Sequence, residues 1–144
     1  MVEQDTVKLM RECDAGIKMG ISSIDDVLEY VKDDELKNSL INSKKEHERL
    51  REDVEKLLSG CDDDGKEPNP IAKGMAWMKT NVKLVINESD TTIADLITDG
   101  CNMGVKSLNK YLNQYRAASE EVKDIAKKLI KTEECLREDM RKFL

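Results

Sequence analysis

Residues 48–58 read Glu-Arg-Leu-Arg-Glu-Asp-Val-Glu-Lys-Leu-Leu, and residues 134–144 read Glu-Cys-Leu-Arg-Glu-Asp-Met-Arg-Lys-Phe-Leu. Seven of these eleven positions are identical at an offset of 86 residues. A second match lies earlier in each half, where Met-Gly-Ile-Ser-Ser-Ile at 19–24 corresponds to Met-Gly-Val-Lys-Ser-Leu at 103–108, at an offset of 84. The same order of matches in both halves indicates a duplicated helical hairpin related by a pseudo-twofold axis. Chance likeness between amphipathic helices is the alternative.

Apolar residues recur at steps of three and four along both halves, which is the pattern of amphipathic helices. Acidic and hydroxyl residues in the turns supply helix caps, among them Ser119. Short turns force each pair of helices to run antiparallel, whereas the Gly- and Pro-containing stretch 60–70 is the only long break. The sequence therefore predicts one all-α domain, a four-helix bundle over residues 1–144. Its parts are a hairpin at 5–59, a crossover with an extra helix at 60–88, and a hairpin at 90–144. The first helix is expected to span 5–31 and the third helix of the bundle 90–115.

The composition excludes several classes of function. Charged residues make up 38% of the chain and aromatic residues 3%, and 30 acidic against 24 basic side chains give a net charge of −6. This balance disfavours nucleic-acid binding, because an acidic protein repels phosphate groups. No stretch has the apolar length of a membrane span or a signal peptide, so we expect a cytoplasmic protein. The four cysteines have no C-x-x-C spacing and are expected to be free thiols.

The two hairpins, the repeat and the long crossover resemble the ferritin-like superfamily. The tryptophan in the crossover, the Met-Gly step in both halves and the chain length are similar to an uncharacterised bacterial branch of it, a domain of unknown function. The resemblance implies a bundle that can hold two metal ions through Glu-x-x-His motifs. Both motifs are broken here, since Lys44 stands three residues before His47, and Glu133 takes the matching place of the second histidine.

His47 is the only histidine of the chain and lies on the inward stripe of its helix. The repeat gives Glu133 the matching position on the last helix, so we expect a buried hydrogen bond between the two side chains. The alternative is a degenerate metal site for iron, zinc or manganese, in which Asp14 and Asp99 complete the ligands. A cysteine nucleophile would need His47 as its base, and cysteine at such positions is usually a small buried hydrophobic residue.

The crossover carries more apolar surface than one helix stripe needs. One interpretation is that this surface packs against the edge of the bundle; the other is that Trp77 and Met78 contact a second molecule, most simply in a homodimer. No phosphate loop or calcium loop is present in the sequence. The sequence thus favours a protein that is not an enzyme, has no cofactor and acts through protein–protein interaction, with the metal-binding or redox protein as the alternative.

Overall fold

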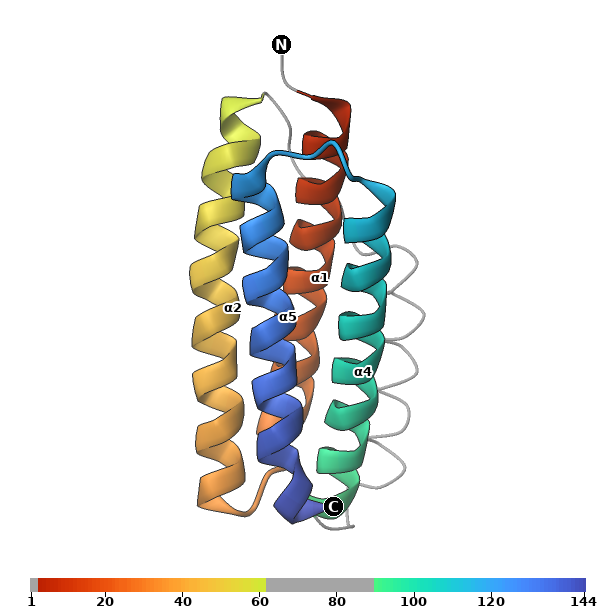
Figure 1. Ribbon diagram of the computed structural model, residues 1–144. Helices are drawn as coiled ribbons and strands as arrows, with labels where there is room; N and C mark the ends of the chain where they lie inside the picture. Colours follow the sequence, from red (N-terminus) through yellow and green to blue (C-terminus); the bar gives the residue numbers. More distant parts are fainter. Residues whose placement is uncertain (1–2, 62–89) are drawn as a thin grey trace.

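Four long helices form a bundle in the computed structural model, which describes residues 3–61 and 90–144 (Figure 1). Helix α1 spans Gln4–Leu28, α2 Asp34–Gly60, α4 Asp90–Gln114 and α5 Glu120–Met140, and a short 3-10 turn covers Arg141–Phe143. Within these ranges the fold is all-helical, as predicted. No helix of the described ranges combines the length and the apolarity that crossing a membrane requires. The predicted crossover helix, with Trp77 and Met78, lies outside the described residues.

Helices α2 and α5 begin where the sequence supplies capping side chains. Asp33 accepts hydrogen bonds from the backbone amides of Glu35 and Leu36 at the start of α2, and Ser119 accepts from that of Val122 at the start of α5. These bonds satisfy amide groups that have no partner within the helix. These caps help to fix where α2 and α5 start, and therefore which of their residues face the core.

Helix α1 ends at Leu28, three residues before the predicted end at Val31. The backbone amide of Val31 bonds to Leu28, only three residues earlier, so the last turn tightens and leaves the α-helical pattern. The amides of Lys32 and Asp33 then donate to the two carboxylate oxygens of Asp90, both at 2.9 Å. The chain turns here because its amides bond to the first residue of α4 instead of continuing the helix.

The turn between α4 and α5 is held in the same way by the start of α1. The backbone amide of Ser119 donates to the hydroxyl of Thr6 at 2.8 Å, and that of Ala117 donates to the carboxylate of Asp5 at 3.1 Å. Each turn is thus fastened to the beginning of a helix from the other half of the chain. Helix α1 packs against α2, α4 against α5, and the two pairs meet through α2–α5 and α1–α4 contacts.

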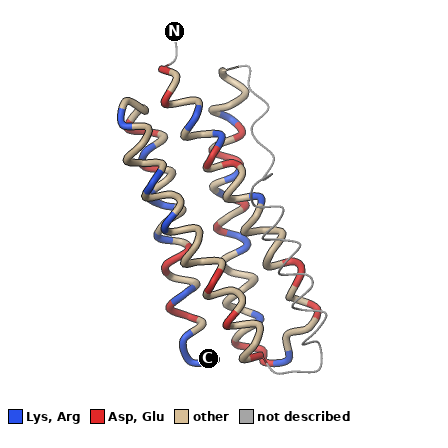
Figure 2. The backbone as a smooth tube through the Cα atoms, turned by 90° about the vertical axis from the view of Figure 1, so that its right-hand side faces the viewer, with Lys and Arg blue, Asp and Glu red and all other residues tan. Residues whose placement is uncertain are grey.

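The core consists of two apolar clusters at opposite ends of the bundle. Leu9, Ile17, Val54 and Leu129 belong to one cluster, and Ile24, Leu40, Ile97 and Met140 belong to the other. On every helix, the residues of the two clusters are separated by one stretch that belongs to neither cluster. Charged residues of both signs are interleaved on the helices (Figure 2). Because the two clusters are separated on every helix, the apolar core of the bundle is interrupted at mid-height.

Candidate functional site

His47, which lies on α2, occupies the interruption between the two core clusters and is completely buried. Its Nδ1 atom lies 2.8 Å from the backbone carbonyl oxygen of Ser43, and its Nε2 atom lies 2.7 Å from Oε1 of Glu133 on α5. The predicted contact between the two side chains is confirmed. A carbonyl oxygen can only accept, so Nδ1 carries a hydrogen and donates it to Ser43. The other ring nitrogen, Nε2, faces Glu133.

The 2.7 Å contact between Nε2 and Glu133 must itself contain a proton. Without one, a lone pair of the ring would face a carboxylate oxygen, which is repulsive in a buried site. The pair therefore holds one proton in addition to the Nδ1 hydrogen and has no net charge. Cys101 on α4 lies near Glu133, and the carboxylate adds to burial in raising the pKa of the Cys101 thiol. Side chains of α2, α4 and α5 thus meet around one cavity.

The pKa of His47 reflects two opposing effects. Burial disfavours the charged ring and lowers the pKa, whereas the hydrogen bond to Glu133, its negative charge, the carbonyl of Ser43 and the charge of Glu46 raise it. The raising effects outweigh burial, and the pKa lies above its ordinary value of 6.5. The ring is therefore held in its protonated form by its neighbours.

Two glycines pack against the pair from the other two helices. A Cβ atom on Gly20 of α1 would lie 2.5 Å from Nε2 of His47, closer than real atoms approach. A Cβ atom on Gly104 of α4 would lie 3.5 Å from Oε2 of Glu133, an ordinary contact. The two glycines that the repeat matches thus lie at the same height, each against one member of the pair.

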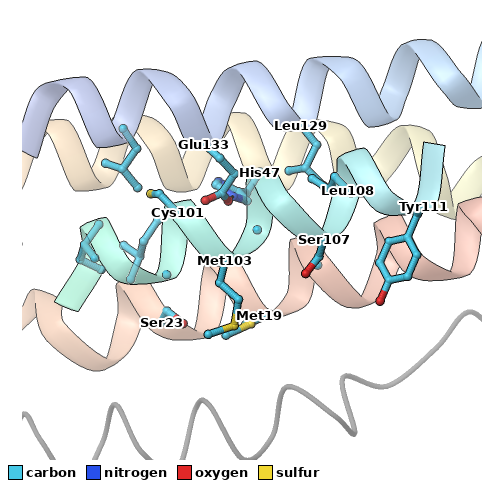
Figure 3. A pocket seen from close by; sticks show the side chains of 17 residues that line it. Met19, Ser23, His47, Cys101, Met103, Ser107, Leu108, Tyr111, Leu129 and Glu133 are labelled. Atoms are coloured by element: carbon cyan, nitrogen blue, oxygen red, sulfur yellow. The ribbon is translucent and has the colours of Figure 1, made fainter. Parts of the chain in front are cut away.

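A cavity of about 240 Å³ lies between α1 and α4, with the pair on one side of it (Figure 3). The half-exposed side chain of Met103 and the side chain of Met19 lie on the side opposite the pair. Residues 16–23 and 100–107 both read Gly-x-x-Met-Gly-x-x-Ser, and all four named positions of each segment line the cavity. The match between the two halves therefore begins three residues before Met19 and Met103, at Gly16 and Gly100. The hollow itself arises because glycines leave space between two helices that otherwise pack closely.

The other proposed metal ligands are not gathered around the pair. Asp14 is buried on α1, where its carboxylate forms an ion pair with Lys18 at 2.8 Å, and Asp99 is exposed on α4. Neither lines the cavity. In the described part of the chain, no three His, Cys, Asp or Glu side chains are placed so that they could hold a metal ion. The proposed set of His47, Glu133, Asp14 and Asp99 is therefore not assembled in the structure.

The buried thiols are poorly suited to nucleophilic chemistry. Burial, with the nearby charges of Glu12 and Asp14, raises the pKa of Cys13 to about 12. Burial and then Glu133 raise the pKa of Cys101 as well. The reactive thiolate is thus disfavoured at neutral pH at both positions. All four cysteines are free thiols in the structure.

Comparison with known proteins finds no family model, no curated protein and no solved structure that matches this chain.

We expect the pair to behave as one unit in a double-mutant cycle. Glu133→Leu leaves Nε2 of His47 unbonded and should destabilise the fold by about 1–3 kcal/mol. His47→Leu leaves a buried carboxylate without its cation and should cost about 3–5 kcal/mol. The double change to leucine should lower the free energy of unfolding by much less than the sum of the two single changes, because both polar groups are removed together. Urea unfolding measures all four proteins, and additive effects would show that the two residues do not interact.

A second test compares the two glycines at the level of the pair. Gly20→Ala forces the hydrogen-bonded ring of His47 to move and should destabilise the protein by about 1–3 kcal/mol. Gly104→Ala is the matched control, since its Cβ fits and alanine favours a helix by up to about 1 kcal/mol over glycine. Thermal unfolding compares the two variants. Equal effects would contradict the close approach of Gly20 to the ring.

Proposed function

We propose that this protein is a ferritin-like four-helix bundle, built from a duplicated hairpin, that acts through protein–protein interaction and not through catalysis. The side chains at mid-bundle support this proposal better than they support the metal-binding alternative. The histidine and the glutamate bond to each other, and the acids that would complete a metal site lie elsewhere or are already paired. The pair is therefore proposed as a structural element of a binding protein.

Equivalent interactions in the two halves support the duplication. Thr6 and Asp90 are 84 residues apart, Asp33 and Ser119 are 86 apart, and so are His47 and Glu133. The side chain of Thr6 accepts from the amide of Ser119, and that of Asp90 accepts from the amide of Asp33. A pseudo-twofold axis that exchanges the hairpins would exchange these two bonds. The same operation maps the His47 to Glu133 contact onto itself.

The groove between α1 and α4 is the interaction face that we propose. Met103 is 50% exposed, and the other large exposed apolar side chain in the described ranges, Leu144, lies at the C-terminus. Methionine is flexible and adapts to the shape of a partner, and glycines beside it leave room for the partner's side chains. A face that has both a projecting methionine and a hollow is suited to self-association. We therefore propose a homodimer in which this groove is covered.

Met103→Asp should weaken self-association about tenfold or more, because it places a charge in an apolar contact. Leu144→Asp is the matched control, since it changes an exposed apolar residue outside the groove to the same acid. Light scattering after gel filtration, over a range of micromolar concentrations, gives the dissociation constant of each protein. A strictly monomeric wild type, or equal effects of both substitutions, would contradict the proposal.

A further inference from the structure

We infer that the contact between His47 and Glu133 is the recognition element by which the two hairpins select each other. The first hairpin consists of α1 and α2, and the second of α4 and α5. Each hairpin accepts a hairpin that carries the other member of the pair and excludes one that carries the same member. The inference rests on the duplication proposed above and adds which hairpins can pair. A duplicated hairpin needs such a rule, because it could otherwise pair with the equivalent hairpin of another copy of the chain.

The contact joins the hairpins at a point where equivalent positions meet. His47 lies on α2 and Glu133 on α5, and the two residues occupy the same place in the repeat, 86 residues apart. A hairpin that met its own copy in this arrangement would place two identical side chains opposite each other. The possible like pairs are therefore two histidines or two glutamates.

Two histidines could not satisfy each other at this position. Nδ1 of His47 donates its hydrogen to the carbonyl oxygen of Ser43, so Nε2 of the neutral ring has only a lone pair. Two such rings would turn their lone pairs towards each other. An added proton would join them, but it would bring a positive charge that no carboxylate balances into a completely buried place. The other tautomer would lose the bond to Ser43.

Two glutamates would meet the opposite difficulty. Glu133 lies 2.7 Å from the histidine, and its side chain is 11% exposed. Two carboxyl groups that share such a site cannot both ionise without strong repulsion, and one shared proton leaves a negative charge. In the unlike pair, one donor and one acceptor form a bond that has no net charge. Charge and hydrogen bonding therefore both favour the unlike pair.

The bonds that fasten the turns do not discriminate in this way. The amides of Ser119 and Asp33 donate to Thr6 and Asp90 of the other hairpin, respectively. In a pair of two first hairpins, Thr6 would meet the amide of Asp33, and every residue except proline has such an amide. Apolar contacts also tolerate exchange, since the hydrophobic effect has no direction. The buried pair, in contrast, depends on which two hairpins meet.

Gly104 indicates that the two positions of the pair are interchangeable. The ring of His47 requires Gly20, because a Cβ atom there would lie 2.5 Å from Nε2. Glu133 does not require Gly104, where a Cβ atom would lie 3.5 Å from Oε2. The second hairpin thus has, at the matching place, the glycine that an imidazole needs. A histidine on α5 would also have a backbone carbonyl four residues earlier, as His47 has on α2.

Four full-length proteins test the inference: the wild type, His47→Glu, Glu133→His, and an exchanged protein that carries both substitutions. Thermal unfolding at neutral pH gives the midpoint of each. Either single substitution creates a like pair and should lower the midpoint by about 10 °C or more. The exchanged protein again has one histidine and one glutamate, so its midpoint should lie within about 5 °C of the wild type.

The two glycines give a second readout, which a general loss of packing would not change. Gly20→Ala should destabilise the wild type more than Gly104→Ala does, because the ring lies against Gly20. In the exchanged protein the ring belongs to α5. Gly104→Ala should therefore lower its midpoint by about 5 °C more than Gly20→Ala does. The order of the two effects is expected to reverse.

Each result has a defined meaning for the inference. An exchanged protein that does not fold, or that unfolds as early as the single variants, would overturn the equivalence of the two positions. Like pairs as stable as the wild type would overturn discrimination by the pair. An unchanged order of the glycine effects would show that the ring does not reach the equivalent place, and it would also overturn the inference. Self-association is tested separately by Met103→Asp, so failure of the proposed homodimer would leave these results unaffected.

Discussion

The hydrogen bond between His47 and Glu133 is the interaction on which the arrangement of this bundle depends. It joins α2 to α5 at mid-height, where the two apolar clusters of the core are interrupted. Apolar side chains tolerate small shifts of one helix along another, because one methyl group replaces a similar one. A buried histidine bonded to a buried carboxylate does not tolerate such a shift, since the shift would leave both groups without a partner. We infer that the pair fixes the register of the helices more than it adds to their stability.

The residues around the pair leave the space that the buried His47 and Glu133 side chains need in order to stay bonded. Gly20 is needed because the imidazole ring occupies the space where a Cβ atom would lie. Gly104, which the sequence match pairs with Gly20, lies against Glu133, whose flexible side chain leaves more room. The space that these glycines open towards solvent becomes the cavity between α1 and α4. The polar pair and the groove are thus two results of the same local packing.

The all-helical fold and the polar contact could be predicted from the sequence because both depend on periodicity. His47 continues the apolar stripe of its helix, and the repeat identifies Glu133 as its counterpart, so spacing alone brings them together. The bond between Asp90 and the turn after α1 could not be predicted, because it joins residues 57 and 58 positions apart with no repeating pattern. For the same reason, the end of α1 was placed three residues too late.

The candidate metal ligands show a different limit of sequence reasoning. Asp14 and Asp99 were grouped with the pair by their estimated heights on two helices. Height does not specify direction: Asp99 points to solvent, and Asp14 pairs with Lys18 one turn further along its own helix. The cavity was also missed, since a hollow depends on how far apart two helices lie, which no single helix pattern determines.

The protonation of His47 shows whether the buried contact with Glu133 exists in solution. Nitrogen-15 NMR of the imidazole, followed from pH 5 to pH 9, reports the hydrogen on each ring nitrogen. We expect a hydrogen on Nδ1 throughout and loss of the second proton only above the ordinary pKa of 6.5. Because the folded pKa is raised, the stability from the pair should be complete below about pH 6.5 and decline as the pH rises through the folded value. A ring that titrates at or below 6.5, or that lacks the Nδ1 hydrogen when neutral, would contradict the account.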